Sequence, residues 1–341
     1  MRPKGSQIIF QSMSSARPSG KNYGFPKTAA RGARPIVTQI VEISQDGRYL
    51  SKHRGFMVIR AGDDEVGRVP LDDITALILS AHQITLSKTL IMELAERKAS
   101  VIICGRNYHP VALSLPYDSH HDKAGILWAQ IECSKPLAKR LWQSVVKEKI
   151  NNQRLVLETF NPSSPALSDL DVLARRVKSG DPENMEAQAA RRYWTALLGP
   201  DFRRDFQSGL ENALLNYGYS VLRAATARAA CGAGLTPALG IHHHNRKNPC
   251  ALVDDLMEPF RPLVDKSVRE IMDGKNPSLG DLTPEIKRHL ARVLDEDVVL
   301  ERGSSTVMNA LHRLAQTFVR SLQEKDNVLE FPKFRQANHL F

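Results

Sequence analysis

The sequence predicts an α+β protein in which a small N-terminal β-rich domain precedes a large all-α domain. Two observations carry this prediction. Short β-branched runs separated by turn-forming residues fill residues 36–117, and long segments of helical periodicity replace them from residue 126 onward. With 341 residues, the chain is long enough for two domains and for cores that need no disulfide.

The N-terminal elements are identified by composition. Five β-branched and apolar runs predict strands, at residues 36–43, 56–60, 75–80, 100–104 and 111–115. One helix interrupts them, because Ser87 can cap a segment whose apolar stripe begins at Leu90. Residues 36–117 are therefore predicted to form a small β-rich domain, and the polar residues 118–125 are a predicted linker.

Beyond the linker, β signals almost vanish. Helices are predicted at residues 126–158, 182–198, 201–230, 254–273, 283–294 and 304–324. The all-α domain is accordingly placed at residues 126–325, with a C-terminal tail at 326–341. Neither a glycine-rich phosphate loop nor an internal repeat occurs in the sequence, so nucleotide-driven chemistry is not indicated.

The positive charge is concentrated at the N-terminus. The formal net charge is +10, but seven basic residues precede Glu42, the first acidic residue, which leaves +3 for the rest. Residues 1–35 are rich in Ser, Gly, Pro and Arg and predict a disordered basic extension, although transit peptides share this composition. A DNA-binding hypothesis must therefore rest on local clusters rather than on the net charge.

Membrane and secreted classes are excluded. The longest apolar stretch, residues 74–81, is far shorter than the ~20 residues that span a bilayer. The four cysteines are scattered without a C-x-x-C spacing, which argues against a disulfide framework or a zinc knuckle. A cytoplasmic location is expected.

Glu186 is the first candidate for chemistry. It lies in a helix predicted to start at Asp181 and Pro182, an N-cap residue with proline at the first helical position. Steps of 100° place Glu186 within an arc of apolar side chains that includes Tyr193 and Leu197. A carboxylate there must be paired, hydrogen-bonded or bound to a metal. A buried ion pair with an arginine explains the position equally well.

A histidine triplet and an acidic motif follow. His242, His243 and His244 cannot all address one metal, because neighbouring side chains diverge, and such a triplet alone is more often a surface loop. Asp255 and Glu258 are i, i+3 neighbours on one helix face, where a solvated helix end paired with an arginine is the alternative. One imidazole with two or three carboxylates is typical of Mg²⁺ or Mn²⁺ sites that polarise phosphodiesters.

Basic pairs near these residues are candidates for DNA binding. Arg191 and Arg192 follow Glu186, and Arg246 and Lys247 follow the histidines. Cations at these positions could hold a phosphate backbone without reading its sequence, although each pair could also be a solvated surface.

Four motifs resemble a known family. They are E-A-x-A-A-R-x-Y-W at 186–194, N-x-x-L-N-Y-G-Y at 212–219, G-L-x-P-x-x-G-I-x-H at 234–243 and D-L-M-E-P-F-R-P at 255–262. Their order and the domain layout resemble the CRISPR-associated integrase, protein one of the spacer-acquisition machinery, and most of all its type II branch. The resemblance covers residues 36–325, so residues 1–35 have no family counterpart. Ala187 stands where many relatives have glycine.

The resemblance implies a site and an activity. Glu186, His243 and Glu258 would bind Mg²⁺ or Mn²⁺, and Asp255 would be the accompanying catalytic acid. The family joins 3′-hydroxyl ends of captured double-stranded DNA into the repeat array by transesterification. The resemblance also implies that residues 36–117 are the dimerisation domain and residues 126–325 the catalytic domain. The family's homodimers flank CRISPR-associated protein two in a heterohexamer, and the RNA-guided effector nuclease is a further possible partner. The alternatives are a free-standing metal-dependent endonuclease or resolvase that uses water, and an inactive subunit that only binds DNA.

Overall fold

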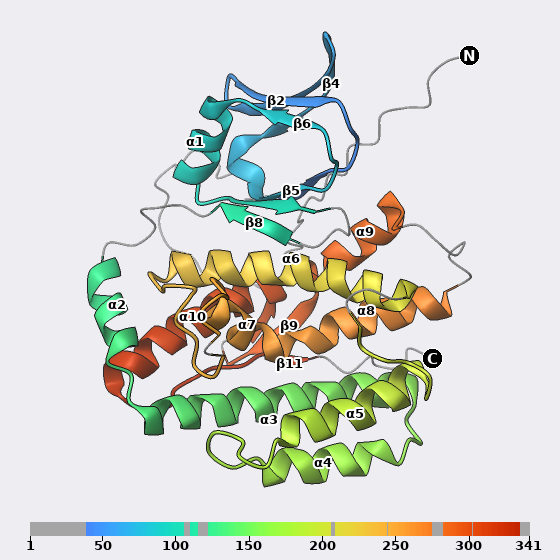
Figure 1. Cartoon of the computed structure of the whole chain (residues 1–341), viewed down its shortest axis with the longest axis vertical. Helices are drawn as coiled ribbons and strands as arrows, with labels where there is room; N and C mark the ends of the chain where they lie inside the picture. Colours follow the sequence, from blue (N-terminus) through green and yellow to red (C-terminus); the bar gives the residue numbers. More distant parts are fainter. Residues whose placement is uncertain are drawn as a thin grey trace, which may run out of the picture.

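The structure is a computed structural model that describes residues 39–105, 110–114, 122–205, 209–243, 245–274, 282–301 and 303–334. A β-rich part is followed by a mostly helical part, so the predicted α+β order is confirmed (Figure 1). The predicted extension at 1–35 and residues 118–121 of the predicted linker lie outside the described residues. The other half of the linker prediction was wrong, because residues 123–125 already belong to the helix Lys123–Ile131.

Two four-stranded sheets form the β-rich part. Its elements are β1 (Gln39–Ile43), β2 (Arg48–His53), β3 (Phe56–Ala61), β4 (Asp64–Pro70), η1 (Leu71–Asp73), β5 (Ile74–Leu79), β6 (Ile84–Leu86), α1 (Lys88–Glu96), β7 (Ser100–Cys104) and β8 (Pro110–Ser114). One sheet has the order β1-β5-β7-β8 and the other the order β4-β3-β2-β6. Ser87 caps α1 as predicted, accepting a hydrogen bond from the Leu90 N–H at 3.3 Å. Leu50 of β2, Leu77 of β5 and Leu90 of α1 belong to one buried cluster that joins both sheets and the helix.

The helical part differs from the prediction at several boundaries. Its elements are α2 (Lys123–Ile131), α3 (Lys135–Phe160), α4 (Ala166–Arg176), α5 (Met185–Leu198), α6 (Leu210–Gly232), α7 (Ala251–Met257), η2 (Glu258–Phe260), α8 (Arg261–Asp273), α9 (Pro284–Ala291), η3 (Arg292–Asp295), β9 (Asp297–Leu300), β10 (Gly303–Thr306), α10 (Val307–Glu324) and β11 (Lys333–Phe334). The single helix predicted at 126–158 is wrong, because Ser134 starts a second helix by capping α3. Helix α4 and the small sheet β10-β9-β11 were not predicted.

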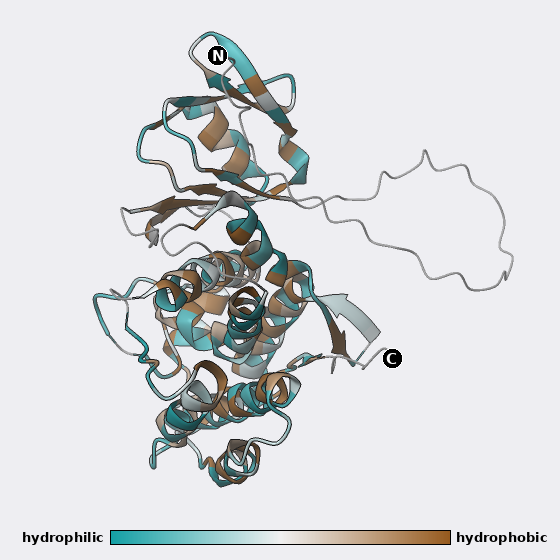
Figure 2. Ribbon diagram, turned by 90° about the vertical axis from the view of Figure 1, so that its right-hand side faces the viewer, coloured by the Kyte–Doolittle hydropathy of each residue, from teal (hydrophilic) through white to brown (hydrophobic). Residues whose placement is uncertain are grey.

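Helix α6 forms the centre of the helical part. It lies between the sheet that contains β8 and the α3–α5 layer (Figure 1), and most of its side chains are buried. A methyl group on Gly218 would lie 2.4 Å from Val264 Cγ1, so glycine permits the close approach of α6 and α8. Figure 2 shows hydrophobic residues within both the β-rich and the helical part.

A buried ionic cluster joins the two parts. Glu42 of β1 accepts hydrogen bonds from Lys287 Nζ of α9 at 2.9 Å and from the Tyr217 hydroxyl of α6 at 2.8 Å. All three residues are nearly inaccessible to solvent. Buried charges that are paired and hydrogen-bonded tie the segments that carry them into one arrangement. The sheet that contains β1 is therefore held against α6 and α9.

Among the described residues, no helix is long and apolar enough to cross a membrane.

Candidate metal site

Helix α5 positions Glu186, although it starts later than predicted. Its N-cap is Asn184, in the left-handed conformation at φ 52°, so the prediction of Asp181 as N-cap and Pro182 as first helical residue was wrong. Asp181 nevertheless accepts hydrogen bonds from the backbone N–H groups of Met185 and Glu186, at 2.8 and 3.0 Å. A carboxylate therefore does stabilise this helix start, from one turn upstream.

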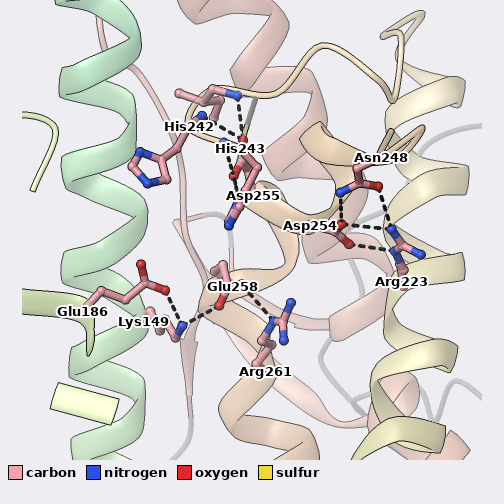
Figure 3. A network of polar contacts seen from close by, with 11 residues as sticks. Lys149, Glu186, Arg223, His242, His243, Asn248, Asp254, Asp255, Glu258 and Arg261 are labelled. Atoms are coloured by element: carbon pink, nitrogen blue, oxygen red, sulfur yellow. Dashed lines mark hydrogen bonds and ion pairs between the residues drawn. The ribbon is translucent and has the colours of Figure 1, made fainter. Parts of the chain in front are cut away.

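Glu186 and Glu258 converge on one ammonium group. Lys149 Nζ of α3 lies 2.5 Å from Glu186 Oε1 and 2.6 Å from Glu258 Oε2 (Figure 3). The side chains of Lys149 and Glu258 are 13% and 6% exposed. Burial by itself would lower the pKa of Lys149, but the charges of Glu258 and Glu186 outweigh burial and raise that pKa above its usual value. The predicted alternative of a buried ion pair is thus present, with a lysine rather than an arginine.

Glu258 is the more enclosed of the two carboxylates. Arg261 Nε lies 3.0 Å from Glu258 Oε1, and the Arg261 guanidinium lies over the Tyr219 ring, 4.9 Å from its centroid. Burial opposes ionisation of Glu258, yet Arg261 and Lys149 hold its pKa below the ordinary value. Glu258 opens the 3-10 turn η2, and Pro259 follows it directly. A charged carboxylate is thereby maintained inside the protein.

Asp255 orients the histidine loop. Its buried carboxylate accepts hydrogen bonds from the backbone N–H groups of Ile241 at 2.6 Å and His242 at 3.0 Å, and it contacts Nδ1 of His243. The hydrogen bond to Asp255 raises the pKa of His243, against the effect of partial burial, and the charges of Glu258 and Glu186 raise it further. Because Asp255 engages Nδ1, Nε2 is the ring nitrogen of His243 that can bind a metal.

The other histidines differ. His242 stacks on the buried Trp142, with ring centroids 4.2 Å apart and planes at 1°. His244 lies outside the described residues. Of the two histidines that the structure describes here, His243 is the one whose ring contacts Asp255 (Figure 3).

The predicted basic pairs lie in different surroundings. Arg246 and Lys247 line a cavity of about 1080 Å³ that also borders His243. Arg191 and Arg192 are exposed, and Arg192 pairs with Asp169 of α4 at 3.0 Å. Arg246 and Lys247 thus share a cavity with His243, whereas Arg192 is paired with a carboxylate of α4.

Two contributors were missed by sequence reasoning. Lys149 was not predicted to be part of the site, because its contacts with Glu186 and Glu258 join elements that are distant in sequence. Arg223 of α6 forms a two-point ion pair with Asp254, at 2.7 and 2.9 Å, and Asn248 also donates to Asp254 at 2.7 Å. These contacts fix the start of α7, which carries Asp255 three residues before Glu258.

The donor set fits a hard divalent cation. Across the described ranges, no three His, Cys, Asp or Glu side chains lie close enough to hold a metal as they stand. Glu186 and Glu258 instead share the Lys149 ammonium as a stand-in cation, beside an imidazole. Carboxylate oxygens and one imidazole nitrogen are ligands suited to Mg²⁺ or Mn²⁺.

Comparison with known proteins gives the family. The model of the family "CRISPR associated protein Cas1" matches residues 41–290. A protein of Neisseria meningitidis serogroup C (strain 8013), named CRISPR-associated endonuclease Cas1, is 38% identical over 283 residues, which cover 83% of this chain and 91% of that protein. This chain belongs to the Cas1 family. The resemblance derived from the four motifs is confirmed.

Solved Cas1-like structures agree with the fold. A casposase bound to integration product matches with a TM-score of 0.73 at 22% identity, covering 88% of this chain and 95% of that chain. A Cas1 protein from Thermotoga maritima matches with a TM-score of 0.68 at 15% identity, covering 85% of this chain and 98% of that chain. A Cas6-RT-Cas1–Cas2 complex also gives 0.68 at 20% identity, covering 89% of this chain and 36% of the other. The β-rich and helical parts together therefore have the Cas1 fold.

Proposed function

We propose that this Cas1-family protein is a divalent-metal-dependent DNA integrase of CRISPR adaptation. It joins the 3′-hydroxyl ends of captured DNA fragments to a repeat array by transesterification. The observation that carries the proposal is the convergence of Glu186 and Glu258 on one cation position. The charges of both carboxylates also act on His243, whose pKa they help to raise. The endonuclease name of the Neisseria relative and the integration product held by the casposase support the choice of DNA as substrate.

Each residue of the candidate metal site has a distinct proposed role. Glu186, Glu258 and Nε2 of His243 would hold Mg²⁺ or Mn²⁺, which supplies Lewis-acid activation of a 3′-hydroxyl and stabilises charge on the reacting phosphate. Asp255 keeps the His243 ring in the tautomer that presents Nε2. Arg261 holds Glu258 in its charged form.

Other cations would position the DNA. Arg246 and Lys247, at the cavity next to His243, would contact the phosphate backbone of the reacting strand. Arg191 and Arg192 would contact DNA farther along the surface, where they are exposed. Such contacts contribute affinity that falls with increasing salt.

The proposed assembly follows the family. Two copies would pair through the β-rich domain, and two such dimers would flank Cas2 in a heterohexamer. The name of the Cas6-RT-Cas1–Cas2 complex, whose Cas1 part shares this fold, supports Cas2 as a partner. A two-fold dimer presents separate active sites, one for each end of a captured fragment.

The nucleophile distinguishes integration from hydrolysis. The protein and Cas2 are incubated with Mg²⁺ or Mn²⁺, a repeat-bearing plasmid, and duplexes ending in either a 3′-hydroxyl or a 2′,3′-dideoxynucleotide. Only the 3′-hydroxyl duplex should join. Glu186→Ala, His243→Ala and Glu258→Ala should each abolish joining while DNA binding persists. Equal joining of blocked ends, or hydrolytic nicks alone, would favour the free-standing nuclease that uses water.

A further inference from the structure

Lys149 lies between the carboxylates of Glu186 and Glu258. Its ammonium lies at 2.5 and 2.6 Å from one oxygen of each of two carboxylates that belong to different elements. Glu186 lies on α5 and Glu258 on η2, so the lysine bridges segments that meet only in the folded protein. A Lys side chain in such a position neutralises charge that would otherwise be buried without compensation.

The helix that carries Lys149 is fixed at this point. Asn152, three residues further along α3, donates a hydrogen bond from Nδ2 to the carbonyl oxygen of Pro259 at 2.8 Å. Pro259 directly follows Glu258 in η2. The α3 backbone is therefore tied to the turn that carries the carboxylate, and Asn152 is almost completely buried. The ammonium can therefore leave Glu258 by movement of the flexible four-carbon Lys149 side chain, without movement of the α3 backbone.

The remaining charges do not replace Lys149. Arg261 pairs with Oε1 of Glu258, whereas Lys149 pairs with Oε2. Glu186 is held by the same ammonium, and its side chain is 22% exposed. Without Lys149, two carboxylates would face one another with one guanidinium on the far side of Glu258. Like charges in this arrangement repel each other.

A divalent ion would need the same place. Mg²⁺ takes oxygen ligands at about 2.0–2.1 Å, so an ion bound to both carboxylates would lie between the oxygens that now contact Nζ. An ammonium at 2.5 and 2.6 Å from those oxygens already fills that position. The two cations exclude each other sterically and electrostatically.

We propose that Lys149 is the internal counter-ion of the metal-free site, and that a divalent ion binds Glu186 and Glu258 only by displacing its ammonium. This proposal rests on the proposed metal-dependent function. Lys149 thereby stabilises the metal-free protein and weakens its affinity for the metal. Loss of a residue with a merely structural role would instead weaken metal binding.

The test measures metal binding without DNA or catalysis. Mn²⁺ is titrated into the full metal-free chain by calorimetry, and thermal unfolding is followed with and without Mn²⁺. Lys149→Met should bind Mn²⁺ at least tenfold more tightly than the wild type. Its melting temperature should be lower than that of the wild type without metal, and should rise more on addition of Mn²⁺. The matched control is Lys147→Met, two residues away on α3, which should leave the Mn²⁺ affinity within about twofold of the wild type.

The outcomes separate this inference from the proposed function. In one outcome, the wild type binds Mn²⁺ and Glu258→Gln does not, but Lys149→Met binds Mn²⁺ no more tightly than the wild type. This outcome would overturn the role of Lys149 and leave the metal-dependent function standing. Absence of Mn²⁺ binding in both the wild type and Lys149→Met would overturn the metal-dependent function together with this inference.

A second measurement covers a Lys149→Met variant that does not fold. Lys149 of the wild type is acylated with an amine-reactive reagent and quantified by mass spectrometry. Displacement by Mn²⁺ should increase its labelling severalfold, with labelling of Lys147 as the internal control. Unchanged labelling of Lys149 would overturn the proposal.

Discussion

A methyl group at Gly240 should disable the site without removing any polar group. The Cβ of an alanine at this position would lie 2.5 Å from the carbonyl oxygen of His243, 2.9 Å from Asp255 Oδ2 and 3.1 Å from Ala251 Cβ. Two of these neighbours are the residues that present the imidazole. The glycine of the G-I-x-H motif is therefore required for the close approach of the loop to Asp255.

The size of the effect follows from these distances. Ordinary contact begins near 3.4 Å, so the His243 carbonyl has to move by about 0.9 Å. A displacement of that size breaks or lengthens at least one charge-assisted hydrogen bond to Asp255, which is worth about 1.5–3 kcal/mol. A misplacement of about 1 Å in a catalytic group costs roughly 10²-fold in rate. Gly240→Ala should thus lose about 1.5–3 kcal/mol of unfolding free energy and about 100-fold in DNA joining.

Urea denaturation and the joining assay measure the two effects, and Gly232→Ala is the control. A methyl group on Gly232, the last residue of α6, meets only the His312 ring, at 3.8 Å or more. This control should retain joining and keep its unfolding free energy within about 1 kcal/mol of the wild type, because the methyl group has room and alanine favours helix. If Gly240→Ala retains both wild-type stability and wild-type joining, the loop is not held by this close approach and the reasoning is refuted.

Three further predictions concern stability and the N-terminus. Burial raises the pKa of Asp265 to about 7. Between about pH 4 and 7 this carboxyl ionises in the unfolded chain but stays protonated in the folded protein, so the unfolding free energy falls as pH rises. Asp265→Asn should remove up to about 4 kcal/mol of that decrease, measured by urea denaturation across this range. Asn152→Leu should cost about 1–3 kcal/mol in the same assay at pH 7, because the buried Pro259 carbonyl loses its donor. Deletion of residues 1–35 should leave joining and dimerisation intact and flatten the salt dependence of DNA binding, since seven positive charges are removed.

The fold could be predicted where periodicity was strong and failed where it was weak. The strands β3, β5 and β7 carry consecutive buried apolar residues, and all three were predicted. Strand β2 was missed because Leu50 is its only fully buried residue, so no apolar run marks it. The break before α3 did have a signal, since Ser134 is followed by Pro136 in the first helical turn. Helix periodicity on both sides concealed it.

The site was predictable as far as its motifs reach. Local spacing placed Asp255 and Glu258 on one face, and the structure buries both. Lys149 could not be assigned in this way, because its pairing with Glu186 spans 37 residues and depends on how α3 packs against α5. Its position is determined by tertiary packing, which one-dimensional patterns do not record.

The two acids of the D-L-M-E motif should therefore respond differently to substitution. Oδ2 of Asp255 accepts hydrogen bonds from two backbone N–H groups of the loop, and Oδ1 contacts Nδ1 of His243. Glu258 instead faces the cation position that Lys149 occupies. In Asp255→Asn the oxygen can still accept from the loop, but the amide nitrogen would donate to Nδ1 of His243. That contact moves the ring proton to Nε2, the nitrogen required for the metal.

We expect the unfolding free energy of Asp255→Asn to lie within about 1 kcal/mol of the wild-type value. Its Mn²⁺ affinity and its joining rate should each fall roughly 10–100-fold, the usual effect of removing a partner that orients a metal ligand. Asp255→Ala should also lose about 1.5–3 kcal/mol of stability, because the loop N–H groups lose a charged acceptor. It should weaken joining without abolishing it, since Glu186 and Glu258 remain. Calorimetry and urea denaturation of the two variants separate orientation of His243 from support of the loop. Wild-type Mn²⁺ affinity in Asp255→Asn would show that the tautomer of His243 is set by another group, and that Asp255 acts only on the loop.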